Sequence, residues 1–164
     1  TQWLVLKDIA DVVRRAGIRK LVIMNGHGGN HFKNMLRELT VHEPDLFACA
    51  VDWYSAAPWK EYFSDLGDHA GELETSAMLH IAPQWVSPLE EAGDGAAKKF
   101  KIKALREGWA ISQRKWTEVT ADTGVGNPCA STAEKGVRFL EACTQRMAAF
   151  FAELAAADPD NLYE

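Results

Sequence analysis

The stretch Leu21-Val22-Ile23-Met24-Asn25-Gly26-His27-Gly28-Gly29-Asn30 contains the pattern that decides the fold. Its first four residues form a continuous apolar run, which predicts a strand buried on both faces of a parallel sheet. The glycines that follow indicate a tight turn, and Asn30 is a suitable N-cap for a helix that Pro44 ends. The stretch therefore predicts a strand, a glycine-rich turn and a helix.

The same alternation extends to both sides of this stretch. Apolar residues at helical spacing predict a helix from Trp3 to Ala16, with Gly17 as its C-terminal stop. A second apolar run, 46–51, predicts another buried strand. The order helix, strand, helix, strand predicts a three-layer α/β/α fold with a mainly parallel sheet. Further along the chain we expect an aromatic loop at 53–69, helices at 71–81 and 131–156, and a possible strand at 116–119.

Composition limits the function classes that fit. The 164 residues suit one domain, and we expect 1–164 to form a single, partial one. A formal charge of −5 argues against nucleic-acid binding, and no apolar run is long enough for a membrane helix. Three cysteines with no zinc or disulfide spacing suit a reducing compartment, so we expect a cytoplasmic protein.

His27 stands at the carboxyl end of the first predicted strand, where open α/β sheets bind ligands. The imidazole is a potential metal ligand, and the glycines remove bulk around an ion. The turn is alternatively an anion-binding loop, although His31 stands where G-x-G-x-x-G and P-loop motifs require glycine. A third interpretation is a tight turn whose histidine serves only structure.

The segment 68–76 is the second candidate site, since it carries one histidine and three carboxylates. On a helix that starts near Ala70, Glu74 is expected to point toward the apolar side and Glu72 away from it. A buried carboxylate needs a partner, for which a metal ion or a histidine would serve. His69, just before the helix, is a candidate proton donor or substrate anchor. Alternatively, Asp68 is an N-cap and the other polar residues are solvated.

Three features together resemble the creatininase (creatinine amidohydrolase) family. They are Met24–Asn30, His69-Ala70-Gly71 with Leu73-Glu74-Thr75-Ser76, and Gly124-Val125-Gly126-Asn127-Pro128 followed by Ala133-Glu134-Lys135-Gly136. The resemblance implies an α/β/α fold and a dinuclear site for Zn, Mn or Fe. It implies hydrolysis of a cyclic amide or related C–N bond by metal-activated water, because members act on creatinine, formamides, a peptide or a ring ketone.

The resemblance also implies residue roles and an assembly. His27 and Glu74 would be metal ligands, and His69 and Glu74 catalytic residues. The remaining candidates are expected to bind substrate; they are Gly28, Gly29, Trp53 and Asp68. Trp53 is as well suited to core or interface packing. A small-molecule substrate and a homo-oligomer, a hexamer in related proteins, are further expectations.

Two departures from the family pattern qualify these expectations. Creatininase itself has a bulky residue and a glutamate where this chain has Gly28 and Gly29, which favours the branch with Gly-His-Gly-Gly-Asn. The family's Glu-x-His pair and bridging aspartate have no counterpart, since Val41-His42-Glu43 falls at a predicted helix end. We therefore expect the remaining ligands to lie outside this chain. A phosphate- or nucleotide-binding module and a non-catalytic family member stay open as alternatives.

Overall fold

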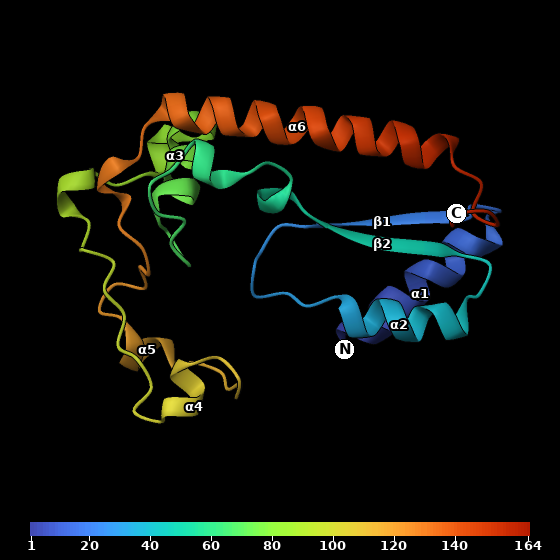
Figure 1. Ribbon diagram of the computed structural model, residues 1–164, viewed down its shortest axis with the longest axis horizontal. Helices are drawn as coiled ribbons and strands as arrows, with labels where there is room; N and C mark the ends of the chain where they lie inside the picture. The colour runs from blue at the N-terminus through green and yellow to red at the C-terminus, as the bar shows by residue number, and fades with distance from the viewer. The chain divides into compact units, whose positions relative to one another are not determined.

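In the computed structural model, which describes all residues, 1–164, the chain forms two compact units. Unit 1 contains 1–56 and 143–164, and unit 2 contains 57–142. Figure 1 shows the chain, in which the long C-terminal helix contributes residues to both units. Whether the units form the single domain expected from the sequence stays a prediction.

Unit 1 is built on two parallel strands, β1 (Lys20–Asn25) and β2 (Phe47–Asp52), which pair in register from Lys20 with Phe47 to Asn25 with Asp52. The helices α1 (Gln2–Arg15) and α2 (Lys33–His42) cover one face, and the C-terminal half of α6 (Ala133–Ala156) lies on the other (Figure 1). This arrangement confirms the predicted α/β/α layers and the parallel sheet.

The core of unit 1 lies between the sheet and the helices α1 and α2. Ala10, Leu39 and Leu46 are almost fully buried there, and Trp3 and Leu21 pack against them. Burying such apolar side chains contributes about 25 cal/mol per Å² of apolar surface removed from water. The helix and strand predictions for this part are confirmed, with one exception. The α2 helix begins at Lys33, so the prediction that Asn30 is its N-cap is wrong.

Unit 2 has the helix α3 (Glu72–Ile81), the first part of α6, two one-turn helices and several 3₁₀ turns. Its core includes Phe63 and Phe139, whose rings meet edge-on with centroids 5.1 Å apart, and Leu73 on α3. The predicted strand at 116–119 is wrong, because Trp116–Val119 forms the short helix α5. Figure 1 shows α5 beside the other short helix, α4 (Lys103–Arg106). No helix of either unit has the length and apolar character needed to cross a bilayer.

Candidate functional site

The glycine-rich turn follows β1 and is ordered by hydrogen bonds among its own residues. The side-chain oxygen of Asn25 accepts hydrogen bonds from the His27 N–H and from the Asn30 side chain, both at 3.1 Å. The Asn30 N–H donates to the His27 carbonyl at 3.1 Å, and the Gly29 N–H donates to His27 Nδ1 at 2.8 Å. The asparagine expected to cap α2 therefore closes this turn instead.

Asp52 supports the turn from the end of the neighbouring strand. The Asn25 amide donates to the Asp52 carboxylate at 2.6 Å, and Asn25 itself is only 2% exposed. The Tyr54 hydroxyl also bonds to Asp52, and its pKa is raised by burial, by the Asp52 charge and by this bond. A Cβ atom added at Gly28 would lie 3.5 Å from the Tyr54 hydroxyl oxygen. The sequence did not indicate three residues that support this turn, which are Asn25, Asp52 and Tyr54. A signal was present for the first two, because Asn25 ends β1 and Asp52 ends the adjacent β2.

Gly29 is required by the position of the His27 ring. A Cβ atom at Gly29 would lie 2.9 Å from His27 Cε1 and 3.0 Å from Nδ1, so a side chain there would force the His27 ring to move. Since Nδ1 accepts the Gly29 N–H, a metal ion would have to bind at Nε2 or displace this hydrogen bond. The turn therefore fixes the orientation of an exposed imidazole at the carboxyl end of the sheet.

The second candidate segment lies in unit 2 and is held by backbone bonds to the Gly124–Asn127 loop. The His69 N–H donates to the Val125 carbonyl at 2.9 Å, and the Val125 N–H donates back at 2.8 Å. Gly126, with φ of 134°, has room for no Cβ, because that atom would lie 2.6 Å from the Gly67 Cα. The Gly124–Asn127 motif thus fixes the backbone of His69.

The two glutamates at the start of α3 exchange the positions predicted for them. Glu72 is 1% exposed, whereas the Glu74 side chain is 48% exposed, so the prediction that Glu74 leans into the apolar side is wrong. The buried face of α3 contains Glu72, Leu73, Ser76 and Ala77, and Ile81 is exposed. This face is rotated from the predicted one because Glu72 finds its cationic partner in α6.

Glu72 is a structural carboxylate. One oxygen accepts hydrogen bonds from the Ser64 N–H and hydroxyl and from the Asp65 N–H, and the other accepts from Lys135 at 2.5 Å. Burial alone would raise the pKa of Glu72, but the hydrogen bonds from Lys135, Ser64 and Asp65 outweigh it and lower the pKa to about 2. Both carboxylate oxygens of Glu72 accept hydrogen bonds from within the protein, so this side chain has a structural role.

Glu74, in contrast to Glu72, is exposed at the start of α3. Its Oε2 accepts the Ala70 N–H at 2.7 Å and lies 3.9 Å from His69 Nδ1. Asp68 pairs with Arg114, with 2.5 Å between the carboxylate oxygen and Nη1. Three of the predicted site residues, Asp68, His69 and Glu74, therefore gather at the start of α3. Arg114 is a further site residue, and it comes from a segment whose sequence shows no pattern.

The donor atoms of His27 and Glu74 suit the metals that the family resemblance implies, because imidazole and carboxylate are ligands that Zn and Mn accept. However, the two residues belong to different units, and no group of three or more His, Cys, Asp or Glu side chains is placed to hold an ion. A catalytic zinc usually takes three protein ligands, and neither unit by itself brings three such side chains together.

Comparisons with known proteins agree on one family. The family model described as creatinine amidohydrolase matches residues 1–151. Proteins named mycofactocin precursor peptide peptidase are 31% identical in Mycobacterium ulcerans strain Agy99 and 34% in Mycobacterium tuberculosis strain H37Rv, over 137 residues. Each alignment covers 79% of this chain and 48% of the relative, so the chain spans about half the length of the curated relatives it matches.

Solved structures give the same result. A Bacteroides fragilis NCTC 9343 protein, provisionally described as a creatinine amidohydrolase, is 45% identical with a TM-score of 0.89. That match covers all of this chain and 64% of the other. A mutant creatininase described as the Zn-Zn type is 25% identical with a TM-score of 0.71, covering 93% of this chain and 63% of the other. With its fold and most of its length matched, the chain belongs to the creatininase (creatinine amidohydrolase) family.

Proposed function

We propose that the chain forms part of a metal-dependent hydrolase that cleaves an amide C–N bond in a small molecule or peptide. The observation that carries the proposal is the His69 imidazole, which lies with Nδ1 3.9 Å from Glu74 Oε2 on a backbone fixed by Val125. The names of the relatives also support it, because they describe creatinine amidohydrolases and peptidases, both of which cleave C–N bonds.

His69 is proposed to deliver the proton that the leaving nitrogen needs. Its ring is 39% exposed, so substrate can reach it, and both of its backbone polar groups are engaged by Val125. The Glu74 carboxylate, 3.9 Å from Nδ1, is the group proposed to orient the ring, as a carboxylate next to a catalytic histidine commonly does. Because Glu74 Oε2 is itself held by the Ala70 N–H, the orientation does not depend on a mobile side chain.

His27 and Glu74 are the residues of this chain proposed to hold metal, each with ligands supplied from elsewhere. If bound there, divalent ions would supply the chemistry that activates water and polarises a carbonyl. The Gly29 N–H fixes the His27 ring, and Asn25 fixes the His27 backbone. Glu74 Oε1 has no hydrogen bond in the structure, whereas Oε2 is engaged, so Oε1 is the oxygen proposed to face an ion.

Phosphate or nucleotide binding by the Gly26–Asn30 turn is the main alternative, and the geometry disfavours it. An anion-binding loop presents several unpaired N–H groups to its ligand. Here the N–H groups of His27, Gly29 and Asn30 all donate within the turn. The α2 helix begins only at Lys33, beyond the turn, so its N-terminus does not join it.

The test uses the full-length protein that contains this chain. Metal content would be measured first, and hydrolysis would then be assayed on creatinine, an N-formyl amine and an N-acetylated peptide. We expect hydrolysis of at least one amide, loss of bound metal in His27→Ala, and a fall of at least about 100-fold in kcat with metal retained in His69→Ala. A protein without metal, or phosphate binding that survives chelation, would contradict the proposal. A metal-loaded protein inactive on every amide would identify a non-catalytic member.

A further inference from the structure

Arg114 lies against the predicted catalytic segment within unit 2. Its Nη1 is 2.5 Å from the Asp68 carboxylate, so the guanidinium is anchored one residue away from His69. The Arg114 side chain is 34% exposed and that of Asp68 55%, which means that solvent and ligands reach the pair. Exposed ion pairs of this kind contribute little to stability, so the fold gives no strong reason for this arginine.

The side chains of Arg114 and His69 both contact the indole ring of Trp116. The guanidinium carbon lies 4.5 Å from the centre of the indole, and the His69 ring meets the same indole edge-on with centroids 5.3 Å apart. Stacking holds a guanidinium flat and leaves its edge donors to form hydrogen bonds. Both groups therefore contact the same side chain, within reach of one small substrate.

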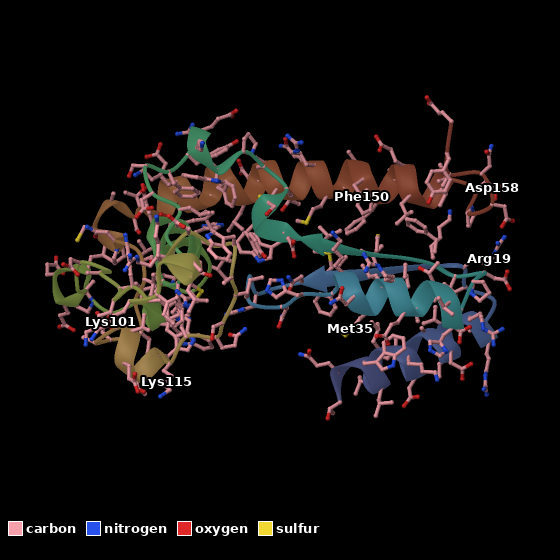
Figure 2. The ribbon with its side chains drawn as sticks, turned by 60° about the horizontal axis from the view of Figure 1, so that its bottom comes forward. Arg19, Met35, Lys101, Lys115, Phe150 and Asp158 are labelled. Carbon is pink, nitrogen blue, oxygen red and sulfur yellow. The ribbon has the colours of Figure 1, made fainter.

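The surroundings of Arg114 attract anions. A cavity of about 830 Å³ is bounded by Arg114 and by five other basic side chains, with Glu118 as its one acidic residue. Cavities of about 300–1,000 Å³ suit small-molecule ligands. Figure 2 shows Lys101 and Lys115 in this part of unit 2. The five other basic residues are Lys98, Lys99, Lys101, Arg106 and Lys115.

This positive charge is local. Residues 97–119 contain seven Lys and Arg residues against two Glu residues, although the whole chain has a formal charge of −5. Of the basic side chains, Arg106 is occupied by the carbonyls of Phe100 and Lys101, whereas Asp68 takes only one nitrogen of Arg114. An arginine presents two parallel N–H groups that match the two oxygens of a carboxylate. Arg114 is thus the basic group next to His69 with donors to spare.

We propose that Arg114, stacked on Trp116, binds a carboxylate group of the substrate beside His69. The proposal rests on the proposed function, because it makes Arg114 a specificity determinant for the amide that His69 helps to cleave. The ligand class is a carboxylate within a few bonds of the scissile C–N bond. A small organic acid and the free C-terminus of a peptide share this chemistry.

The test measures binding to the full-length protein by calorimetry with two pairs of probes. Glutarate is compared with glutaramide, and N-acetyl-trialanine with its C-terminal amide, so that the first pair differs in two carboxylates and the second in one. We expect at least one acid to bind at least about tenfold more tightly than its amide. The pair that shows the preference distinguishes a small acid from a peptide terminus.

Three variants assign the preference to one residue. Arg114→Gln should abolish it, and Arg114→Lys, which keeps the charge without the planar fork, should reduce it by at least about threefold. Lys103→Gln is the matched control, because Lys103 belongs to the same basic segment but is 77% exposed and does not line the cavity. It should leave the preference unchanged. If Arg114→Gln does not fold, Arg114→Lys decides the question.

The proposal is overturned if neither acid is preferred over its amide, or if Arg114→Lys and every other folded Arg114 variant keep the full preference. Equal losses in Arg114→Gln and Lys103→Gln would also overturn it, because they would indicate general attraction to the basic segment. Hydrolysis without a carboxylate preference would remove this binding site and leave the proposed function intact. A carboxylate preference in a protein that hydrolyses no amide would support this binding site and contradict the proposed function.

Discussion

Replacing Glu72 with Gln tests the reasoning about the two glutamates of α3. The Glu72 carboxylate is 1% exposed and its ionised form is held by Lys135, Ser64 and the Asp65 N–H. Burial raises the pKa of Glu72, but the hydrogen bonds outweigh this effect, and the pKa falls from 4.5 to about 2. A decrease of this size corresponds to about 3 kcal/mol of stability from the ionised carboxylate. Since Gln is neutral and nearly isosteric, Glu72→Gln should lose about 3 kcal/mol at pH 7.

The lowered pKa of Glu72 determines how its contribution to stability changes with pH. A carboxylate whose folded pKa is lowered stabilises the protein above its unfolded pKa, and this stability disappears as the pH falls through the folded value. For Glu72, the stability is fully present above about pH 4.5 and is lost between about 4.5 and 2. Gln has no such titration. The difference between wild type and Glu72→Gln should therefore be constant from pH 5.5 to 7 and shrink below pH 4.5.

Urea denaturation at pH 7, 5.5 and 3 measures this difference. Glu74→Gln is the matched control, because Glu74 lies on the same helix turn, is 48% exposed and accepts one backbone hydrogen bond. It should cost less than about 1 kcal/mol at every pH. A Glu72→Gln cost below about 1 kcal/mol, or one that does not change between pH 7 and 3, would refute the account of the buried carboxylate.

Two further predictions concern glycines. Gly29→Ala should weaken Zn²⁺ binding by the full-length protein about tenfold in a metal titration, because its Cβ would displace the His27 ring. Gly26→Ala, whose Cβ would meet nothing within 4 Å, should have no effect, and equal losses in both variants would contradict the reasoning. Gly126→Ala should cost about 2–4 kcal/mol in thermal or urea unfolding, since its φ is positive and its Cβ would lie 2.6 Å from Gly67. A cost below about 1 kcal/mol would show that the loop relaxes easily.

Elements defined by local apolar patterns were predictable from the sequence. Both strands of unit 1, α1, α3 and α6 were located within one or two residues, because continuous apolar runs and helical spacing depend on neighbours in the chain. Asn30 shows where local rules stop. Its side chain suits an N-cap, but Asn25 offers it a partner five residues earlier, so it closes the turn and α2 begins later.

Residues whose roles depend on distant partners were not predictable. Trp116 lies in a short segment with strand propensity, yet it forms a helical turn, and its ring is contacted by His69 and Arg114. Helical spacing alone predicts that Glu72 points away from the apolar side, and its actual partner, Lys135, lies 63 residues away in the chain. Tertiary context overrides local preference at these positions, and no pattern within the segment indicates it.

The two candidate segments, one in each unit, are ordered in the same way, by hydrogen bonds from neighbouring residues. At the first, Asn25 and Asp52 satisfy the polar groups of the turn, so the position of His27 does not depend on a ligand. At the second, paired N–H and carbonyl groups join His69 to Val125. Each imidazole is therefore carried by a backbone that is ordered in advance, which would lower the reorganisation needed in the metal-binding and catalytic roles proposed for them. Buried Glu72 adds to this order because it ties the start of α3 to α6 through Lys135, whereas Glu74 stays exposed.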